Sequence, residues 1–337
     1  MFHFQPIKTG LNRLNQSLER IMPIITPTGV ILGLILGSRV SWMKPSVTWM
    51  FAFLTFSGAL GISSSNFLNV VKKPKNILIF FLGTNIIMPL LAWMLASLFF
   101  GSQPAVVTGY VLLLSIPTAV SGYIWSAIYR GNGALSLTLI LISTILAPIL
   151  TPYTINLLTQ SSVAIDTSSM ILSLLKMVVL PSLLGVSLNS LTKGKVTVNV
   201  APTLKPFSKV ALFFVIIINT SLVSERLLAE ATWAYLPIAL LCAFLAASGY
   251  PIAYSLGRLA KIPHEENISI TFASSMRNIS AALVLAIEFF PAQTALPVIF
   301  GIVFQQTVCA FMGHFLFGRK MLSEPILRRK PCKQSQQ

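Results

Sequence analysis

The chain has 337 residues, of which 55% are hydrophobic and only 9% are charged, and its mean hydropathy is +0.80. This composition excludes a soluble globular protein and indicates a polytopic membrane protein embedded in a lipid bilayer. The net charge of +16 does not indicate nucleic-acid binding, because Lys and Arg of membrane proteins collect in cytoplasmic loops and tails.

Apolar segments of about 20 residues, the length that crosses a bilayer as a helix, recur along the whole chain. They predict an all-α protein of ten spans at residues 20–41, 46–66, 76–100, 105–129, 133–158, 169–190, 207–224, 232–258, 266–289 and 292–318. This divides the chain into a basic N-terminal tail (1–19), a membrane domain (20–318) and a basic C-terminal tail (319–337).

The connections between spans alternate in basic residues. Lys72, Lys73 and Lys75 follow the second span, for example, and no Lys or Arg follows the third. The positive-inside rule therefore predicts a multi-pass protein of the inner (cytoplasmic) membrane with both termini in the cytoplasm. An even number of spans is then required, which agrees with ten.

Ten spans can be divided into two halves of five, at about 20–158 and 169–318, that lie in opposite orientation. Such inverted repeats are typical of secondary transporters, whose equivalent helices are often broken near the bilayer midplane. Here the fourth span contains Pro117, Ser121 and Gly122 near its middle, and a proline inside a helix removes a backbone hydrogen bond. We expect this span to be broken and to cross an equally broken ninth span.

The ninth span holds five polar residues within seven positions: Ser274, Ser275, Arg277, Asn278 and Ser280. An arginine at the centre of a bilayer costs about 3 kcal/mol on insertion scales, so this group is expected to face a cavity or a partner. A single Pro is often only a kink, and Ser often serves helix packing. The matching position of the two interruptions favours a functional site.

Other classes of protein fit less well. Cys242, Cys309 and Cys332 are scattered, so the sequence predicts neither a disulfide framework nor a metal site. No nucleophile–base pair or metal-ligand cluster falls in the spans, so we expect no enzymatic activity and no cofactor. A passive channel, the remaining alternative, usually shows repeated rings of charges or carbonyls. No obligate protein partner is inferred.

Several stretches resemble the bile acid:sodium symporter family, in the same order and over roughly residues 20 to 315. They are NFLNVVKKPK (66–75), IMPLLA (87–92), YRGNGALS (129–136), STILAPILTP (143–152), and Met276 with Asn278. The resemblance implies a ten-span fold with a panel and a core domain. It also implies alternating-access transport of amphipathic organic anions together with sodium.

The resemblance places the family's sodium-site positions on Thr84, Gly122, Tyr123, Ser136, Ile140, Ala273, Ser274, Met276 and Arg277. Most of them depart from the family's pattern. Gly122 and Tyr123 replace a Ser–Asn pair, and Ile140 replaces a Thr. Ala273 replaces the carboxylate that joins the two sodium sites, and Arg277 replaces a Gln.

These departures argue against sodium binding. Sodium is a hard cation that binds oxygen ligands, and two like charges at about 4 Å repel by roughly 4 kcal/mol at an effective dielectric of 20. We therefore predict that the Arg277 guanidinium takes the place of a sodium ion or receives an anionic substrate. The alternative is an orthodox sodium-coupled symporter whose sodium sites are displaced.

The candidate substrate is a small organic anion, such as a carboxylate or a sulfonate, whose identity the sequence leaves open. The candidate substrate contacts are Ser121, Tyr123, Arg277, Asn278 and Gln305.

Overall fold

The computed structural model describes residues 28–62, 74–159, 166–222, 224–229 and 232–318. All regular structure within these residues is helical, as predicted. The two predicted basic tails, and parts of the first two predicted spans, lie outside the described residues. Within the described part of the chain, six helices are long and apolar enough to cross a membrane: Pro74–Phe100, Gly133–Thr159, Thr167–Leu191, Ala201–Ser221, Leu236–Leu259 and Ala292–Gly318.

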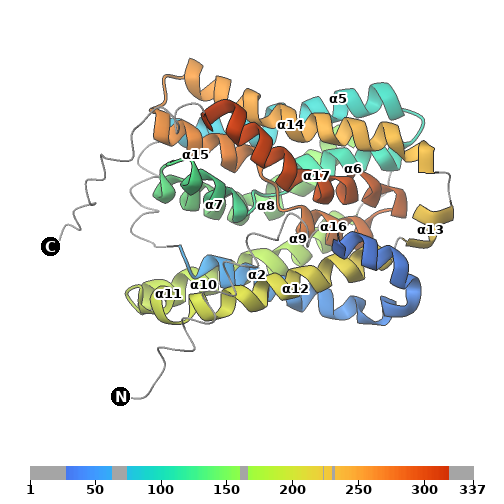
Figure 1. Cartoon of the computed structure of the whole chain (residues 1–337), viewed down its shortest axis with the longest axis horizontal. Helices are drawn as coiled ribbons and strands as arrows, with labels where there is room; N and C mark the ends of the chain where they lie inside the picture. Colours follow the sequence, from blue (N-terminus) through green and yellow to red (C-terminus); the bar gives the residue numbers. More distant parts are fainter. Residues whose placement is uncertain (1–27, 63–73, 160–165, 223, 230–231, 319–337) are drawn as a thin grey trace.

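The helices form a smaller and a larger layer (Figure 1). In the smaller layer, α2 packs against both α10 and α12. This layer contains a helical segment at 28–36, η1 (Gly37–Met43, 3-10), α2 (Lys44–Ala59), η3 (Leu175–Val179, π), α10 (Leu180–Leu191), α11 (Lys195–Asn199), α12 (Ala201–Ser221) and α13 (Ser224–Ala229). Helix α9 (Thr167–Leu174) leads into it from the larger layer.

The larger layer contains α4 (Pro74–Phe81), η2 (Leu82–Ile87, π), α5 (Met88–Phe100), α6 (Pro104–Ser115), α7 (Ser121–Ile128), α8 (Gly133–Thr159), η4 (Thr232–Tyr235, 3-10), α14 (Leu236–Leu259), α15 (His264–Ser275), α16 (Ile279–Phe289), η5 (Ala292–Thr294, 3-10), α17 (Ala295–Gly313) and η6 (His314–Gly318, π). Helix α16 contacts α2 and α12, so it faces the smaller layer.

Both predicted interruptions are present. Helix α6 ends at Ser115 because the next residue, Ile116, precedes a proline and is extended (φ −68°, ψ 151°), as residues before proline usually are. Helix α15 ends at Ser275, and Met276 is likewise extended (φ −89°, ψ 110°). Each interrupted span is thus a pair of shorter helices, α6 with α7 and α15 with α16.

The predicted start of the seventh span is wrong. The seventh span was predicted at 207–224, but α12 begins six residues earlier, at Ala201. The start was missed because Lys205 and Pro206 lower the apparent hydropathy of this part of the helix. In the structure Lys205 is exposed and Pro206 lies inside the helix, at its sixth residue.

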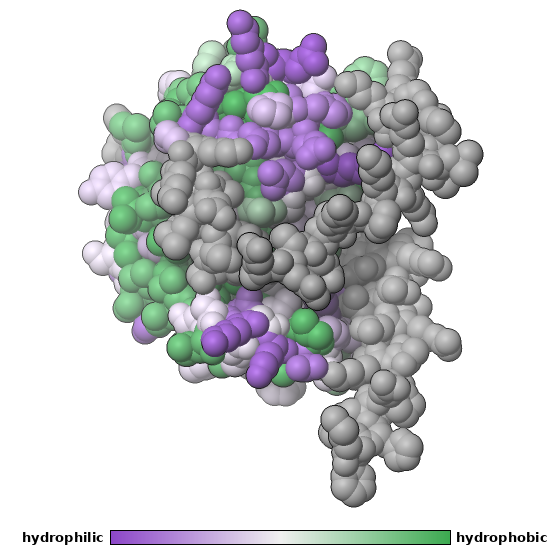
Figure 2. Space-filling model, turned by 90° about the vertical axis from the view of Figure 1, so that its left-hand side faces the viewer, coloured by the Kyte–Doolittle hydropathy of each residue, from purple (hydrophilic) through white to green (hydrophobic). Residues whose placement is uncertain are grey.

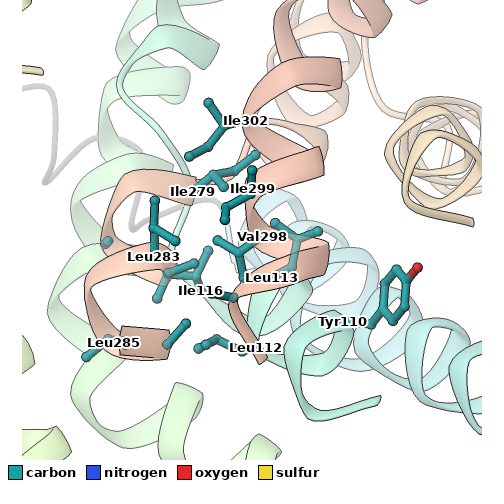
Figure 3. Close-up of a cluster of buried hydrophobic side chains, with 14 of the residues drawn as sticks. Tyr110, Leu112, Leu113, Ile116, Ile279, Leu283, Leu285, Val298, Ile299 and Ile302 are labelled. Carbon is teal, nitrogen blue, oxygen red and sulfur yellow. The ribbon is translucent and has the colours of Figure 1, made fainter. Parts of the chain in front are cut away.

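An apolar cluster holds the broken helices in place. Leu113 and Ile116, at the end of α6, lie among side chains of α16 and α17, including Ile279 and Ile299 (Figure 3). Within a bilayer such packing acts mainly through van der Waals contact, which small residues at helix interfaces allow. Gly109 of α6 is one, because a Cβ there would lie 2.4 Å from the Thr294 carbonyl oxygen.

Three predicted basic connections lie at one end of the molecule, where α7 ends, α11 lies and α15 begins (Figure 1). They carry Arg130, Lys195 and Lys261 respectively. Viewed from this end, hydrophilic residues gather in two groups, with hydrophobic residues on the flank beside them (Figure 2). This is the distribution expected of a membrane protein seen along the bilayer normal.

Candidate functional site

The two interrupted spans meet at their breaks and bond to each other. The backbone N–H of Ala119 donates to the carbonyl of Met276 at 2.9 Å, and the N–H of Asn278 donates to the carbonyl of Pro117 at 2.9 Å. Thr118 and Arg277 form an isolated antiparallel bridge between these bonds. Each break therefore supplies backbone partners that the other lacks, which a non-helical segment inside a membrane requires.

Thr118 ties the same crossing through its side chain. Its hydroxyl lies within hydrogen-bond distance of the carbonyls of Ala273 and of Met276, the latter at 2.8 Å. Its own N–H donates to the Ser143 hydroxyl at 3.2 Å. The sequence analysis did not single out Thr118. Its position directly after Pro117, in the interruption itself, was the available signal.

Arg277 lies inside the crossing and is only 2% exposed. Its guanidinium donates through Nη2 to the Thr84 carbonyl at 2.8 Å and through Nη1 to the Ile116 carbonyl at 3.2 Å. Arg277 forms no ion pair with any residue that the structure describes. The guanidinium thus joins the π-helical segment of the third span to the break of the fourth.

The carbonyls of Thr84 and Ile116 can accept from Arg277 because neither has a backbone N–H donor within its own helix. In an α-helix the Thr84 carbonyl would accept from Met88, but in the π turn the Met88 N–H bonds to Gly83 instead, and Pro89 has no N–H. Ile116 is extended and precedes Pro117, so its carbonyl lies outside the α6 hydrogen-bond ladder. Isolated π turns of this kind are frequent at functional sites.

Two predicted substrate contacts, Gln305 and Asn278, hold the backbone of the ninth-span break. The Oε1 atom of Gln305 accepts from the Arg277 N–H at 2.9 Å. The side chain of Asn278 caps α16 by accepting from the Ala281 N–H at 3.4 Å. Both residues therefore lie at the crossing, where they fix the positions of Arg277 and of the α16 N-terminus.

The other predicted contacts, Ser121 and Tyr123, lie in the first turn of α7, directly after the fourth-span break. Both side chains are half-buried. Gly122, between them, is packed against α15, because a Cβ there would lie 3.2 Å from the Phe272 carbonyl oxygen. Gly122 thus permits a close helix contact where the resemblance implies a side-chain ligand.

Ser136, the sodium-site position retained in the fifth span, belongs to a chain of buried hydroxyls. Its Oγ donates to the Ser126 Oγ at 3.0 Å, which lies 3.0 Å from the Ser269 Oγ. Ser269 in turn donates to the Asn132 carbonyl at 2.9 Å. The sequence analysis missed Ser126 and Ser269, since isolated serines in apolar helices carry no distinguishing signal.

The remaining sodium-site positions are poor in free oxygen atoms. Ile140 and Ala273 are buried and have apolar side chains, and the carbonyls of Ala273 and Met276 already have Thr118 as partner. Ser274 and Thr84 are different, because the buried hydroxyl of each has no hydrogen-bond partner among the described residues. Among the residues that the structure describes, no carboxylate contacts Arg277 or Thr118 at this crossing.

A helical membrane protein whose two broken helices bind each other at their interruptions has the architecture of a secondary transporter. The comparison with protein families agrees: the model of the Sodium Bile acid symporter family matches residues 48–230. The chain belongs to this family.

Three relatives illustrate the range of similarity. The uncharacterized protein YbaS of Bacillus subtilis is 38% identical over 308 residues, which cover 91% of this chain and all of YbaS. The probable sodium/metabolite cotransporter BASS3, chloroplastic, of rice is 26% identical over 309 residues, or 90% of this chain and 72% of the relative. The uncharacterized sodium-dependent transporter YocS of Bacillus subtilis is 30% identical over 145 residues, or 42% of this chain and 44% of YocS.

Proposed function

We propose that this secondary transporter carries small or amphipathic organic anions across the inner membrane by alternating access, without sodium coupling. The observation that carries the proposal is the pair of hydrogen bonds from the Arg277 guanidinium to the carbonyls of Thr84 and Ile116. In this proposal the fixed cation takes the role of a bound sodium ion between the helices.

The oxygen atoms at the crossing support this proposal. Arg277 holds the carbonyls of Thr84 and Ile116, and Thr118 holds those of Ala273 and Met276. A sodium ion there would have to displace these donors and lie near a guanidinium, whose repulsion at about 4 Å is roughly 4 kcal/mol at an effective dielectric of 20. Because the Arg277 guanidinium already holds the helices together, no sodium ion is needed for this purpose.

The same arrangement favours an anionic substrate. Helices α7 and α16 both begin at the crossing, and helix N-termini carry partial positive charge that attracts anions. Ser121, Tyr123 and Asn278 lie in or beside these N-termini and are the proposed contacts for a carboxylate or sulfonate group. Arg277 contributes its positive charge, and Gln305 positions it.

Alternating access fits the predicted inverted repeats, about 20–158 and 169–318. The two interrupted spans occupy the matching fourth and ninth places and bond reciprocally at their breaks. Three basic connections lie at the same end of the molecule (Figure 1). This supports the predicted orientation, in which that end and both termini lie on the cytoplasmic side.

A sodium-coupled symporter with displaced sodium sites is the second candidate. The printed names of two relatives favour it, because one is called a sodium-dependent transporter and the other a sodium/metabolite cotransporter. The hydroxyls of Thr84 and Ser274 are buried and unpartnered, and such a displaced site could use both oxygen atoms.

Transport assays separate these candidates. Purified protein is first screened for organic anions that raise its melting temperature, and uptake of a labelled hit into proteoliposomes is then measured with a sodium or a choline gradient. We expect equal initial rates in the two gradients, saturation with substrate, and counter-exchange. Sodium-dependent uptake would overturn the loss of coupling, and non-saturable uptake without counter-exchange would indicate a passive channel.

A further inference from the structure

A small, partly open cavity lies beside the crossing. Its volume is about 20 Å³, enough for one atom-sized or water-sized occupant. Its walls come from α6, α14, the ninth-span break and α17: Leu113, Leu114, Ala246, Tyr250, Ser275, Arg277, Ile279, Gly301 and Gln305.

The polar groups of this wall are mainly donors. The Nε atom of Arg277 is buried and has no hydrogen-bond partner, although the two other guanidinium nitrogens are bonded. The Gln305 Oε1 accepts from the Arg277 N–H, which turns the Gln305 amide nitrogen away from that bond and leaves it without a partner among the described residues. The hydroxyl of Tyr250 already donates to the Met276 sulfur at 3.2 Å.

The wall also carries a net positive charge. The Arg277 guanidinium is protonated, because arginine is not deprotonated in proteins. No Asp or Glu lines the cavity, and Arg277 has no ion-pair partner among the described residues. A buried charge without a counter-ion is strongly unfavourable. An occupant that accepts hydrogen bonds and carries a negative charge would compensate it, whereas a cation would be repelled.

We propose that this cavity is a binding site for a single halide-sized monovalent anion, chloride under physiological conditions. The anion accepts from the Arg277 Nε–H and the Gln305 amide and packs against the apolar side chains of Leu113 and Ile279. The site does not depend on the proposed transport function, because no transport step enters the argument.

Bromide, which replaces chloride and scatters anomalously, tests the site directly. Crystals of the full-length protein are grown or soaked in sodium bromide, and data are collected at the bromine absorption edge. An anomalous peak in the cavity beside Arg277 is the expected result. A cavity that holds only water, or is empty, gives no peak there and overturns the proposal.

Thermal unfolding in solution gives an independent measurement. Chloride is titrated against gluconate, an anion too large for the cavity, at constant sodium and constant ionic strength. We expect a saturable rise in melting temperature with chloride and with bromide. Equal melting temperatures in chloride and gluconate would contradict the proposal, whatever the outcome of the transport assays.

Two variants assign the effect to this cavity. Arg277→Gln removes the charge, and Ala246→Leu fills the space while leaving Arg277 in place. Both should abolish the chloride-dependent shift, and Phe244→Leu, on the exposed side of the same helix α14, should retain it. If Arg277→Gln does not fold, Ala246→Leu still tests the site. A chloride-dependent shift in its melting temperature as large as that of the wild type would show that chloride binds elsewhere.

Discussion

The Arg277 guanidinium donates a hydrogen bond to the backbone carbonyl of Thr84 at 2.8 Å, across 193 residues of chain. The bond exists because a π turn and Pro89 together deprive that carbonyl of its helical donor. Arg277 thereby connects the third span to the crossing of the fourth and ninth. Together with the bond from Arg277 to the Ile116 carbonyl, this contact is the basis for expecting that sodium is not needed.

Replacing Arg277 should show that both its charge and its fork shape matter. Arg277→Met leaves the buried carbonyls of Thr84 and Ile116 without donors, and each unsatisfied group costs about 1–3 kcal/mol. Arg277→Lys keeps the charge but presents it as a point rather than a planar fork. We expect the melting temperature to be highest for the wild type, lower for the Lys variant and lowest for the Met variant. A Met variant as stable as the wild type would contradict the structural role of the guanidinium.

Restoring the family's residues should restore sodium sensitivity. In the double variant Ala273→Glu with Arg277→Gln, a carboxylate returns and the fixed cation is gone. We expect sodium, but not choline, to raise its melting temperature and stimulate uptake. The single variant Ala273→Glu should not respond, because the new carboxylate would pair with Arg277.

The matched control for this pair is Ala273→Gln with Arg277→Gln, which has nearly the same shape but no carboxylate. It should show little response to sodium. A wild-type protein that already responds to sodium as strongly as the double variant would refute the role of Arg277 as a built-in cation.

Thr118 should stabilise the crossing through its hydroxyl. Thr118→Val has nearly the same shape but leaves the buried carbonyls of Ala273 and Met276 with fewer donors, so we expect a loss of about 1–3 kcal/mol, visible as a lower melting temperature. Thr118→Ser keeps the hydroxyl and should retain most of the stability. Equal destabilisation by Val and Ser would show that the methyl group, not the hydrogen bond, is what matters.

Gly109 should tolerate no side chain. A Cβ there would lie 2.4 Å from the Thr294 carbonyl oxygen, so Gly109→Ala must push α6 away from η5, and overpacking of this kind typically costs about 1–3 kcal/mol. Gly61→Ala is the control, since its nearest neighbour would be 3.7 Å away. A lower melting temperature is expected for Gly109→Ala alone.

The sequence was sufficient to predict the all-helical membrane fold and the two broken spans. These features depend on local signals: long apolar runs, Pro117, and a polar group around Arg277 within an apolar segment. The start of α12 was missed, because Lys205 and Pro206 resemble the end of a connection although they lie in the first turns of the helix.

The partners at the site could not be predicted. The Thr84 carbonyl can accept a hydrogen bond from Arg277 only because of a π turn, and the sequence analysis did not predict that turn. The bond from Gln305 to the Arg277 backbone and the chain from Ser136 to Ser269 join segments that are distant in sequence. Sequence patterns indicate which residues are unusual for a membrane helix, whereas the fold decides what they contact.

The reciprocal bonding of the two breaks has a mechanical consequence. Sliding the fourth span past the ninth would break the two backbone bonds of the crossing, the bonds of Thr118, and the bond from Arg277 to Ile116. At about 1 kcal/mol for each ordinary hydrogen bond, the crossing resists shear far more than the interface between the two layers, where no such set of bonds is found in the described residues. The crossing therefore moves as one rigid piece, and any rocking motion must have its hinge outside it.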